Sequence, residues 1–268
     1  MLYKLPGDTT LAKRKTSELR QEELFYSHSS KKQSKTFYLA DSKTIPFERP
    51  SKQTQNIELI PKTINQERYI LSLLDSSNDI VVGTGPAGTG KTYLAMLAAI
   101  KALKSGECKK IVLTRPMVEV EDEKIGFLPG DINQKMDPWM LPLYDVFHEF
   151  YSVADVTSMI ERKVIEIAPL AFMRGRSLKN AFIILDEGQN ATPNQIKMLL
   201  TRIGEGSKIV ITGDTNQTDR RGPLNGLLDL RARSEVHKVP GLAICDFNHK
   251  DIQRHEIISH ILKMYGEE

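Results

Sequence analysis

The chain is poor in the residues that mark secreted, metal-binding or membrane-spanning proteins. Its 268 residues include only 2 cysteines, Cys108 and Cys245. This pair fits neither a disulfide framework nor the spacing of a metal site. No apolar run approaches the roughly 18 residues that cross a bilayer, and no apolar stretch of signal-peptide length follows Met1. We therefore expect a cytoplasmic protein with two free thiols and no membrane partner.

Aromatic residues and net charge are also scarce, at 7% of the chain and a formal charge of +3. The charge is uneven, because residues 1–55 hold eleven Lys or Arg against six Asp or Glu, a net of +5, which leaves −2 for the rest. Few large apolar residues occur there, so we expect a basic, poorly structured N-terminal arm over 1–55. Such an arm could attract nucleic-acid phosphates, pair with a neighbouring subunit or remain a solvated tail.

Strand-like and helix-like patterns alternate over the remaining residues, 56–268. The expected strands cover residues 79–82, 110–114, 163–167, 181–185, 207–212 and 243–247. The expected helices cover residues 64–74, 92–103, 141–153, 156–161, 193–203 and 251–264. This alternation predicts one α/β domain whose mostly parallel sheet is covered on both faces. Residues 115–138 contain three prolines and no clear period, and we expect this long segment to contact a substrate.

A glycine-rich segment separates the strand expected at 79–82 from the helix expected at 92–103. It fits the phosphate-binding pattern G-x-x-x-x-G-K-[ST] and reads Gly85-Pro86-Ala87-Gly88-Thr89-Gly90-Lys91-Thr92. In such a loop, backbone N–H groups surround a phosphate at the positive end of the following helix. Lys91 is predicted to reach the β- and γ-phosphates, and Thr92 to give its hydroxyl to magnesium. The pattern predicts ATP and Mg²⁺ as ligands, although it recognises the phosphates and not the base.

Two carboxylates, Asp186 and Glu187, follow the apolar strand expected at 181–185. In a parallel sheet this strand end lies beside the phosphate site. Asp186 is predicted to hold the magnesium, directly or through water, and Glu187 to orient and deprotonate the attacking water. An acidic pair alone is often only a solvated strand end. Together with the phosphate loop, the pair favours the catalytic interpretation.

A polar segment, Gly213-Asp214-Thr215-Asn216-Gln217, follows the strand expected at 207–212. This strand end is also expected near the γ-phosphate, where Gln217 could sense phosphate or water through a hydrogen bond. A simple polar turn is the alternative interpretation.

These motifs, in this order and with Gln66 upstream, resemble the core of superfamily 1 helicases. More closely, residues 64–261 resemble the PhoH family of phosphate-starvation-associated ATPases. The residues that carry this resemblance are Gly85 to Thr92, Thr114-Arg115-Pro116, Gly126 to Gly130, Ala168 to Arg176, Leu185 to Asn190, Leu200 to Gly204, Gly213-Asp214 with Gln217, and Asp251 with Arg254-His255. The resemblance implies a single RecA-like P-loop NTPase domain, ATP hydrolysis and an RNA helicase-like activity.

Family position further implies that Gln66 reads the purine, the alternative being an ordinary polar residue in the first turn of a helix. The chain departs from the family at Gly188, where alanine is more usual, an exchange expected to leave the site intact. It also departs at Thr218-Asp219-Arg220, where more apolar residues are common. The short basic N-terminus resembles phage-encoded members.

Helicases of this superfamily close their ATP site with an arginine from a second RecA-like domain. Because the resemblance takes up residues 64–261, we expect this arginine to come from a neighbouring copy in a ring-like homo-oligomer such as a hexamer. The candidates are Arg174, Arg176, Arg202, Arg220, Arg221 and Arg254. Arg254 is favoured because it belongs to a family-matching Asp-x-x-Arg-His segment.

Three functions fit these features. The first is an ATP-driven motor or remodeller of single-stranded RNA or another nucleic acid, with Phe127 and Trp139 as stacking surfaces. The second is an ATP-switched module that binds a protein partner without acting on nucleic acid. The third, a small-molecule phosphotransferase, is disfavoured because Glu187 suits water activation, whereas a kinase excludes water. Stimulation of ATP hydrolysis by RNA separates the first function from the second.

Overall fold

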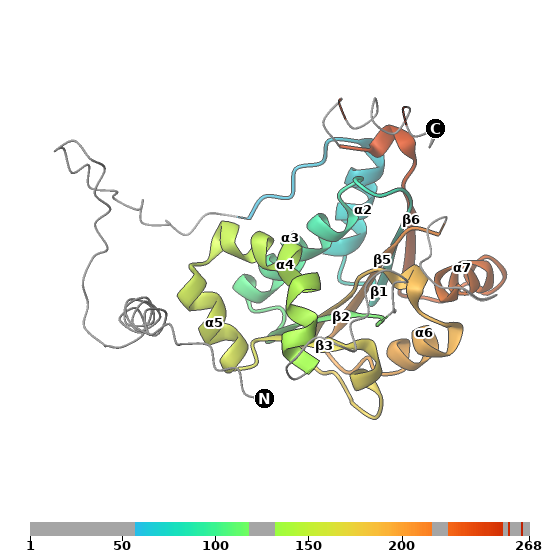
Figure 1. Ribbon diagram of the computed structural model, residues 1–268. Helices are drawn as coiled ribbons and strands as arrows, with labels where there is room; N and C mark the ends of the chain where they lie inside the picture. Colours follow the sequence, from blue (N-terminus) through green and yellow to red (C-terminus); the bar gives the residue numbers. More distant parts are fainter. Residues whose placement is uncertain (1–56, 118–131, 216–224, 254–256, 258–263, 265–268) are drawn as a thin grey trace, which may run out of the picture. The chain divides into compact units, whose positions relative to one another are not determined.

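The computed structural model describes residues 57–117, 132–215 and 225–253 together with positions 257 and 264, and it describes only the backbone of 132–140. Figure 1 shows these parts as coloured ribbon. The expected basic arm, 1–55, lies outside the described residues, so its structure stays a prediction.

The centre of the domain is a six-stranded sheet in which every pairing is parallel. The strand order is β3-β2-β4-β5-β1-β6. The strands are β1 (Ile80–Thr84), β2 (Lys110–Arg115), β3 (Ile165–Pro169), β4 (Ala181–Leu185), β5 (Lys208–Gly213) and β6 (Leu242–Asp246). All five residues of β4 are buried, as expected for a strand covered on both faces. The predicted α/β class with a parallel sheet is confirmed.

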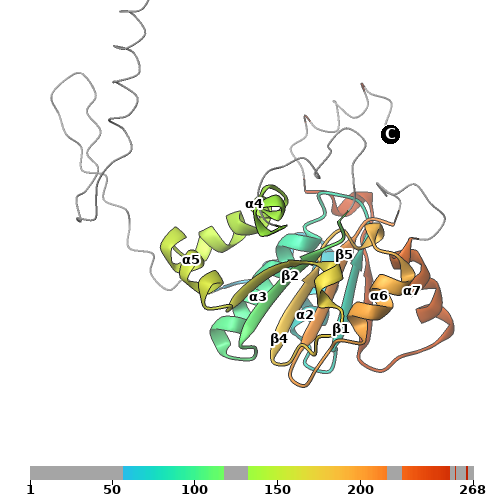
Figure 2. The ribbon, with the colours of Figure 1, turned by 60° about the horizontal axis from the view of Figure 1, so that its bottom comes forward.

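Helices cover both faces of this sheet (Figures 1 and 2). One layer contains α2 (Ile64–Leu74), α3 (Lys91–Ser105), α4 (Ile132–Phe150) and α5 (Val153–Glu161), and the other contains α6 (Pro193–Leu200) and α7 (Gly226–Val236). Side chains alternate along each strand between the two layers. In β5, Val210 packs with the first layer, whereas Ile209 and Ile211 pack with the second. Three short 3-10 helices, η3 (Leu170–Met173), η4 (Gly188–Asn190) and η5 (His249–Asp251), follow strand ends.

Local sequence signals fix several helix ends. The Thr63 hydroxyl caps α2 by accepting a hydrogen bond from the N–H of Gln66. Thr192 and Gln195 form a reciprocal capping box at the start of α6, with Pro193 in its first turn. Helix α3 ends at Gly106, which has a left-handed conformation with φ 80°.

Three helical expectations differ from the structure. Helix α4 begins at Ile132 and contains Pro138, so the expectation of irregular structure across 115–138 is wrong from Ile132 onward; residues 118–131 lie outside the described residues. A proline inside a helix removes one N–H donor and crowds the carbonyl group four residues earlier. The later turns of α4 are nevertheless held to the core by buried Val146 and Phe147. Helix α7 was not expected, and α6 ends at Leu200 rather than at 203.

The helix expected over 251–264 falls mostly outside the described residues. At its start the chain forms the 3-10 helix η5, and residues 252 and 253 are not helical. Among the described helices, none combines the length and apolar character needed to span a membrane. Both cysteines are free thiols, and burial raises the pKa of Cys108 to about 11.

Candidate nucleotide site

The glycine-rich loop connects the carboxyl end of β1 to the first residue of α3, as the sequence predicts. Gly85 opens it with φ 138°, a backbone conformation that residues with a side chain rarely adopt. A Cβ at this position would overlap the carbonyl oxygen of Phe247. Glycine is therefore required here both by the turn and by the close approach of a neighbouring segment.

Lys91 is the first residue of α3, and its side chain lies in the loop with only 8% of the residue exposed. Its ammonium group donates to the carbonyl oxygens of Gly85 at 2.6 Å and Pro86 at 2.7 Å. A phosphate oxygen carries charge and is a stronger acceptor than a neutral carbonyl. The lysine is thus placed to exchange these bonds for contacts with a triphosphate.

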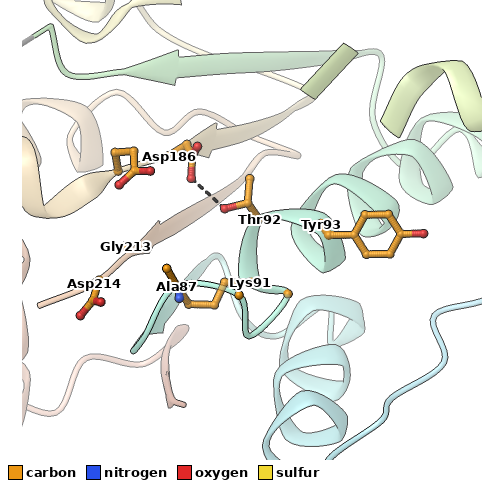
Figure 3. A pocket seen from close by; sticks show the side chains of 10 residues that line it. Ala87, Lys91, Thr92, Tyr93, Asp186, Gly213 and Asp214 are labelled. Atoms are coloured by element: carbon orange, nitrogen blue, oxygen red, sulfur yellow. Dashed lines mark hydrogen bonds between the residues drawn. The ribbon is translucent and has the colours of Figure 1, made fainter. Parts of the chain in front are cut away.

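Three oxygen-bearing side chains meet beside the loop. The hydroxyl of Thr92 donates to Asp186 Oδ1 at 2.8 Å, and the hydroxyl of Thr212 donates to the same oxygen at 2.7 Å. Figure 3 shows Thr92 and Asp186 pointing toward each other, with Tyr93 turned away. Thr212 comes from β5, which lies between the strand that precedes the loop and the strand that carries the acidic pair. The sequence motifs predict no role for Thr212.

Oxygen ligands of this kind suit Mg²⁺, which binds through one or two carboxylates and substrate phosphates. No group of three or more His, Cys, Asp or Glu side chains able to hold a metal occurs among the described residues. A magnesium ion held by Thr92 and Asp186 would therefore share its coordination with the nucleotide.

Glu187 has an unusual backbone conformation at the end of β4. Its φ of 53° lies in the left-handed region, which is uncommon for residues other than glycine and clusters at functional sites. Its carboxylate makes an ion pair with Arg115 at 3.2 Å and accepts a hydrogen bond from Gln189 Nε2 at 2.5 Å. Both carboxylate oxygens of the predicted base therefore have a described partner.

Gln189 ties the ends of two strands together. While its Nε2 donates to Glu187, its Oε1 accepts from the backbone N–H of Asp214 at 3.1 Å, and the residue is only 4% exposed. The sequence identifies Arg115 and Gln189 only as parts of family motifs. The contact of Arg115 with Glu187 and that of Gln189 with Asp214 depend on strand order, which those motifs do not specify.

The space around Gly188 is tighter than expected for a position where alanine is more usual in the family. A Cβ there would lie 2.7 Å from the Ile211 Cγ2 methyl and 3.3 Å from the carbonyl oxygen of Thr212. In this chain the glycine lets the turn after Glu187 pack directly on β5, so the reverse exchange to alanine needs a shift of Ile211.

Gln66 lies against the phosphate loop and is 4% exposed. Its Nε2 donates to the carbonyl oxygen of Thr89 at 3.0 Å, and its Oε1 accepts from the N–H of Lys62 at 2.7 Å. The N–H of Gln253 also donates to the loop, at the carbonyl oxygen of Gly88, 2.8 Å away. Gln66 thus supports the loop through this hydrogen bond to Thr89. Recognition of a purine base by Gln66 stays a prediction.

The candidate sensor Gln217 and the favoured arginine Arg254 lie outside the described residues, as do Arg220 and Arg221. Of the other candidates, Arg176 forms a two-bond ion pair with Glu166, and Arg202 donates to Thr201 Oγ1 and the carbonyl oxygen of Arg176. Arg174 is exposed. Arg176 is therefore occupied within its own chain, which weakens it as a donor to a neighbouring copy.

A cavity of about 290 Å³ unites these elements. It is lined by Ala87, Gly88, Gly90, Lys91, Thr92, Tyr93, Asp186, Glu187, Gly213 and Asp214. The ends of β4 and β5 and the loop after β1 thus enclose one space, and the arrangement can hold phosphate, a divalent cation and a water next to a carboxylate.

Comparison with known proteins gives a consistent result. The family model described as PhoH-like protein matches residues 58–266. A PhoH-like protein of Bacillus subtilis (strain 168) is 40% identical over 99% of this chain and 81% of its own length. A PhoH-like protein of Synechocystis is 47% identical over 76% of this chain, which spans only 61% of that relative. Among solved structures, the SWI2/SNF2 ATPase core of Sulfolobus solfataricus in complex with dsDNA is 14% identical with a TM-score of 0.35, covering 60% of this chain and 34% of that one.

Proposed function

The chain belongs to the PhoH-like protein family, and we propose that it hydrolyses ATP with the help of Mg²⁺. The observation that carries this proposal is the hydrogen bond of 2.8 Å from the Thr92 hydroxyl to Asp186. Thr92 is the last residue of the phosphate-loop motif, and Asp186 directly precedes Glu187. A hydroxyl and a carboxylate beside a phosphate loop form the set that P-loop enzymes use for magnesium.

In this mechanism the chain's own residues bind and orient the triphosphate. The loop N–H groups and the Lys91 ammonium hold the phosphates, and Thr92 and Asp186 hold the magnesium. Bound magnesium would neutralise developing charge on the phosphate oxygens. Glu187 orients a water molecule and accepts its proton as the water oxygen attacks the γ-phosphorus. The bond between the γ-phosphorus and the β–γ bridging oxygen breaks, so ADP and inorganic phosphate are the products. Gln217 and Arg254 are proposed to contact the γ-phosphate, the arginine from a neighbouring copy in a homo-oligomer.

We further propose that hydrolysis is coupled to single-stranded nucleic acid, RNA in the first place. Support comes from the family resemblance and from the basic composition of residues 1–55. The alternative is an ATP-switched module that binds a protein partner. This alternative predicts that RNA does not change the rate of ATP hydrolysis.

The test is steady-state release of phosphate from ATP, with and without single-stranded RNA, in the wild type, Lys91→Ala and Glu187→Gln. We expect RNA to raise the wild-type rate severalfold and both substitutions to abolish turnover. Glu187→Gln should still bind ATP, whereas Lys91→Ala should bind it weakly. Turnover that persists in Glu187→Gln would contradict the assigned base, and a rate indifferent to RNA and DNA would favour the protein-partner function.

A further inference from the structure

Arg115 links the catalytic carboxylate to another part of the sheet edge. It is the last residue of β2, and its guanidinium Nη2 lies 3.2 Å from Glu187 Oε1. The side chains of Arg115 and Glu187 are 27% and 35% exposed, so the pair is neither buried nor fully solvated. A carboxylate in such an ion pair is a poorer general base for water, because the lone pairs that would accept the proton are directed at a cation.

The carboxyl end of β2 also lies beside an exposed surface that suits a nucleic-acid strand. Arg115 is in register with Pro169 at the end of β3, directly before η3. Just beyond Pro169, Phe172 is 50% exposed and Arg174 is exposed. On the β2 side, Met117 is 48% exposed. One sheet edge thus presents two arginines and an exposed aromatic ring, the combination that binds the backbone and bases of single strands.

We propose that Arg115 restrains Glu187 in a less active arrangement, and that a phosphodiester of single-stranded nucleic acid binding along Arg115, Phe172 and Arg174 competes for the Arg115 guanidinium and releases the carboxylate. The proposal rests on the proposed ATPase function, since it assigns Glu187 as the base. Arg115 acts here as a positioning residue that couples strand binding to hydrolysis.

The chemistry of the exchange is an ion-pair substitution in which no covalent bond changes. A guanidinium donates two parallel hydrogen bonds to a phosphate as readily as to a carboxylate. Because Glu187 and the strand compete for one cation, each must weaken the binding of the other to an equal extent. Removing either partner of the ion pair therefore has an effect that can be measured at the other site.

The first experiment measures basal ATP hydrolysis, without nucleic acid, for Arg115→Gln. Arg162→Gln is the matched control, because Arg162 is exposed at the end of α5 and, among the described residues, its side chain donates to the Ser158 carbonyl of its own helix. We expect Arg115→Gln to raise the basal rate about three- to five-fold and to lose most of its response to RNA, with the control unchanged. A partly exposed ion pair contributes up to about 1 kcal/mol, which corresponds to a five-fold effect.

The second experiment measures affinity for a fluorescein-labelled oligouridine by fluorescence anisotropy, in the absence of nucleotide. Glu187→Gln should bind the strand about three- to five-fold more tightly than the wild type, because its neutral amide no longer competes for Arg115. The double variant Arg115→Gln/Glu187→Gln should bind no more tightly than Arg115→Gln. Phe172→Ala and Arg174→Gln should each weaken binding.

The outcomes separate the inference from the proposed function. A basal rate that falls or stays the same in Arg115→Gln overturns the restraint, whatever RNA does. A raised basal rate with equal strand affinity in the wild type and Glu187→Gln overturns the role of the strand and leaves the restraint. If the wild type does not hydrolyse ATP at all, the proposed function fails, and tighter strand binding by Glu187→Gln still decides whether Arg115 is shared.

Discussion

Asp186 Oδ1 accepts hydrogen bonds from two threonine hydroxyls that belong to different elements. Thr92 belongs to the phosphate-loop helix, whereas Thr212 belongs to β5 and is only 1% exposed. If Thr92 turns its hydroxyl toward a magnesium ion, Thr212 remains as the donor that fixes the carboxylate. In the proposed metal site, Thr212 would therefore position the carboxylate of Asp186.

This role predicts a specific defect in Thr212→Val, which keeps the shape of the side chain and removes the hydroxyl. A hydrogen bond to a charged group contributes about 1.5–3 kcal/mol, so the Mg²⁺ concentration that gives half-maximal hydrolysis should rise about tenfold or more. A magnesium titration of the ATPase rate measures this value. Thr157→Val is the control, since Thr157 is exposed and, within the part of the chain that the structure describes, its hydroxyl donates to the Val153 carbonyl of α5. An unchanged magnesium requirement in Thr212→Val would exclude the positioning role.

Residue roles were predictable where the chemistry is local in the sequence. The phosphate loop and Thr92 lie as expected, because a strand followed by this loop and a helix leaves little geometric freedom. Asp186 lies beside them as expected, because it directly follows a buried strand of the parallel sheet. The contacts of Glu187 with Arg115 and of Gln189 with Asp214 join separate strand ends. They were missed because strand alternation does not give the order of strands in the sheet.

At the level of elements, a charged cluster fastens the loop after η3 to the sheet. Glu166 in β3 accepts two hydrogen bonds from Arg176, at 2.5 and 2.8 Å, and lies 3.8 Å from the Lys110 ammonium at the start of β2. The hydrogen bonds from Arg176 lower the pKa of the Glu166 carboxyl below its usual value, although partial burial opposes this. The cluster holds the segment that follows η3, next to Phe172 in η3 and Arg174 at its end.

A lowered carboxyl pKa in the folded state predicts a pH-dependent contribution to stability. The contribution is present above the ordinary pKa of glutamate, near 4.3, and is lost as the pH falls through the lower folded-state value. We expect Glu166→Gln to reduce the free energy of unfolding by about 1–2 kcal/mol at pH 7. The difference from the wild type should shrink as the pH falls below 4.

Urea unfolding at pH 7 and at pH 3.5 measures both values. Glu161→Gln, at the exposed end of α5, is the control that should change little at either pH. A deficit in Glu166→Gln of equal size at both pH values would mean that shape and not charge is responsible.

Helix boundaries were predicted well where apolar spacing and caps agree, as in α2, and poorly where they conflict. In α4, Pro138 argued against a helix, yet the helix runs from Ile132 because its later turns pack on the core. Helix α7 buries only Gly226 and Leu227, and Arg231 and Arg233 interrupt any apolar stripe. Tertiary contacts decide such segments, so periodicity alone does not reveal them.

On the scale of the whole molecule, the α/β class followed from the alternation of strands and helices, but the strand order did not. The order places β5 between β1 and β4, which brings Thr212 and Asp214 into the site. The sequence predicts that the end of this strand lies near the γ-phosphate, but it assigns a role there only to Gln217. The described residues supply the loop, the proposed magnesium ligands and the proposed base from one chain. An arginine for the transition state is expected from a neighbouring copy.

This division of the site between copies predicts complementation between two inactive variants. Lys91→Ala loses its phosphate contacts but keeps Arg254, whereas Arg254→Ala keeps an intact loop; each alone should lose hydrolysis, the latter by about 10³-fold or more. Mixing them should restore part of the rate, because some contacts then pair an intact loop with an intact arginine. Dilution should lower the specific activity of the wild type over the same concentrations at which analytical ultracentrifugation shows the oligomer dissociating. A monomer with full activity at every concentration would refute the shared site. Normal turnover in Arg254→Ala would exclude Arg254 as the shared arginine, and Arg174→Ala would then be mixed with Lys91→Ala in its place.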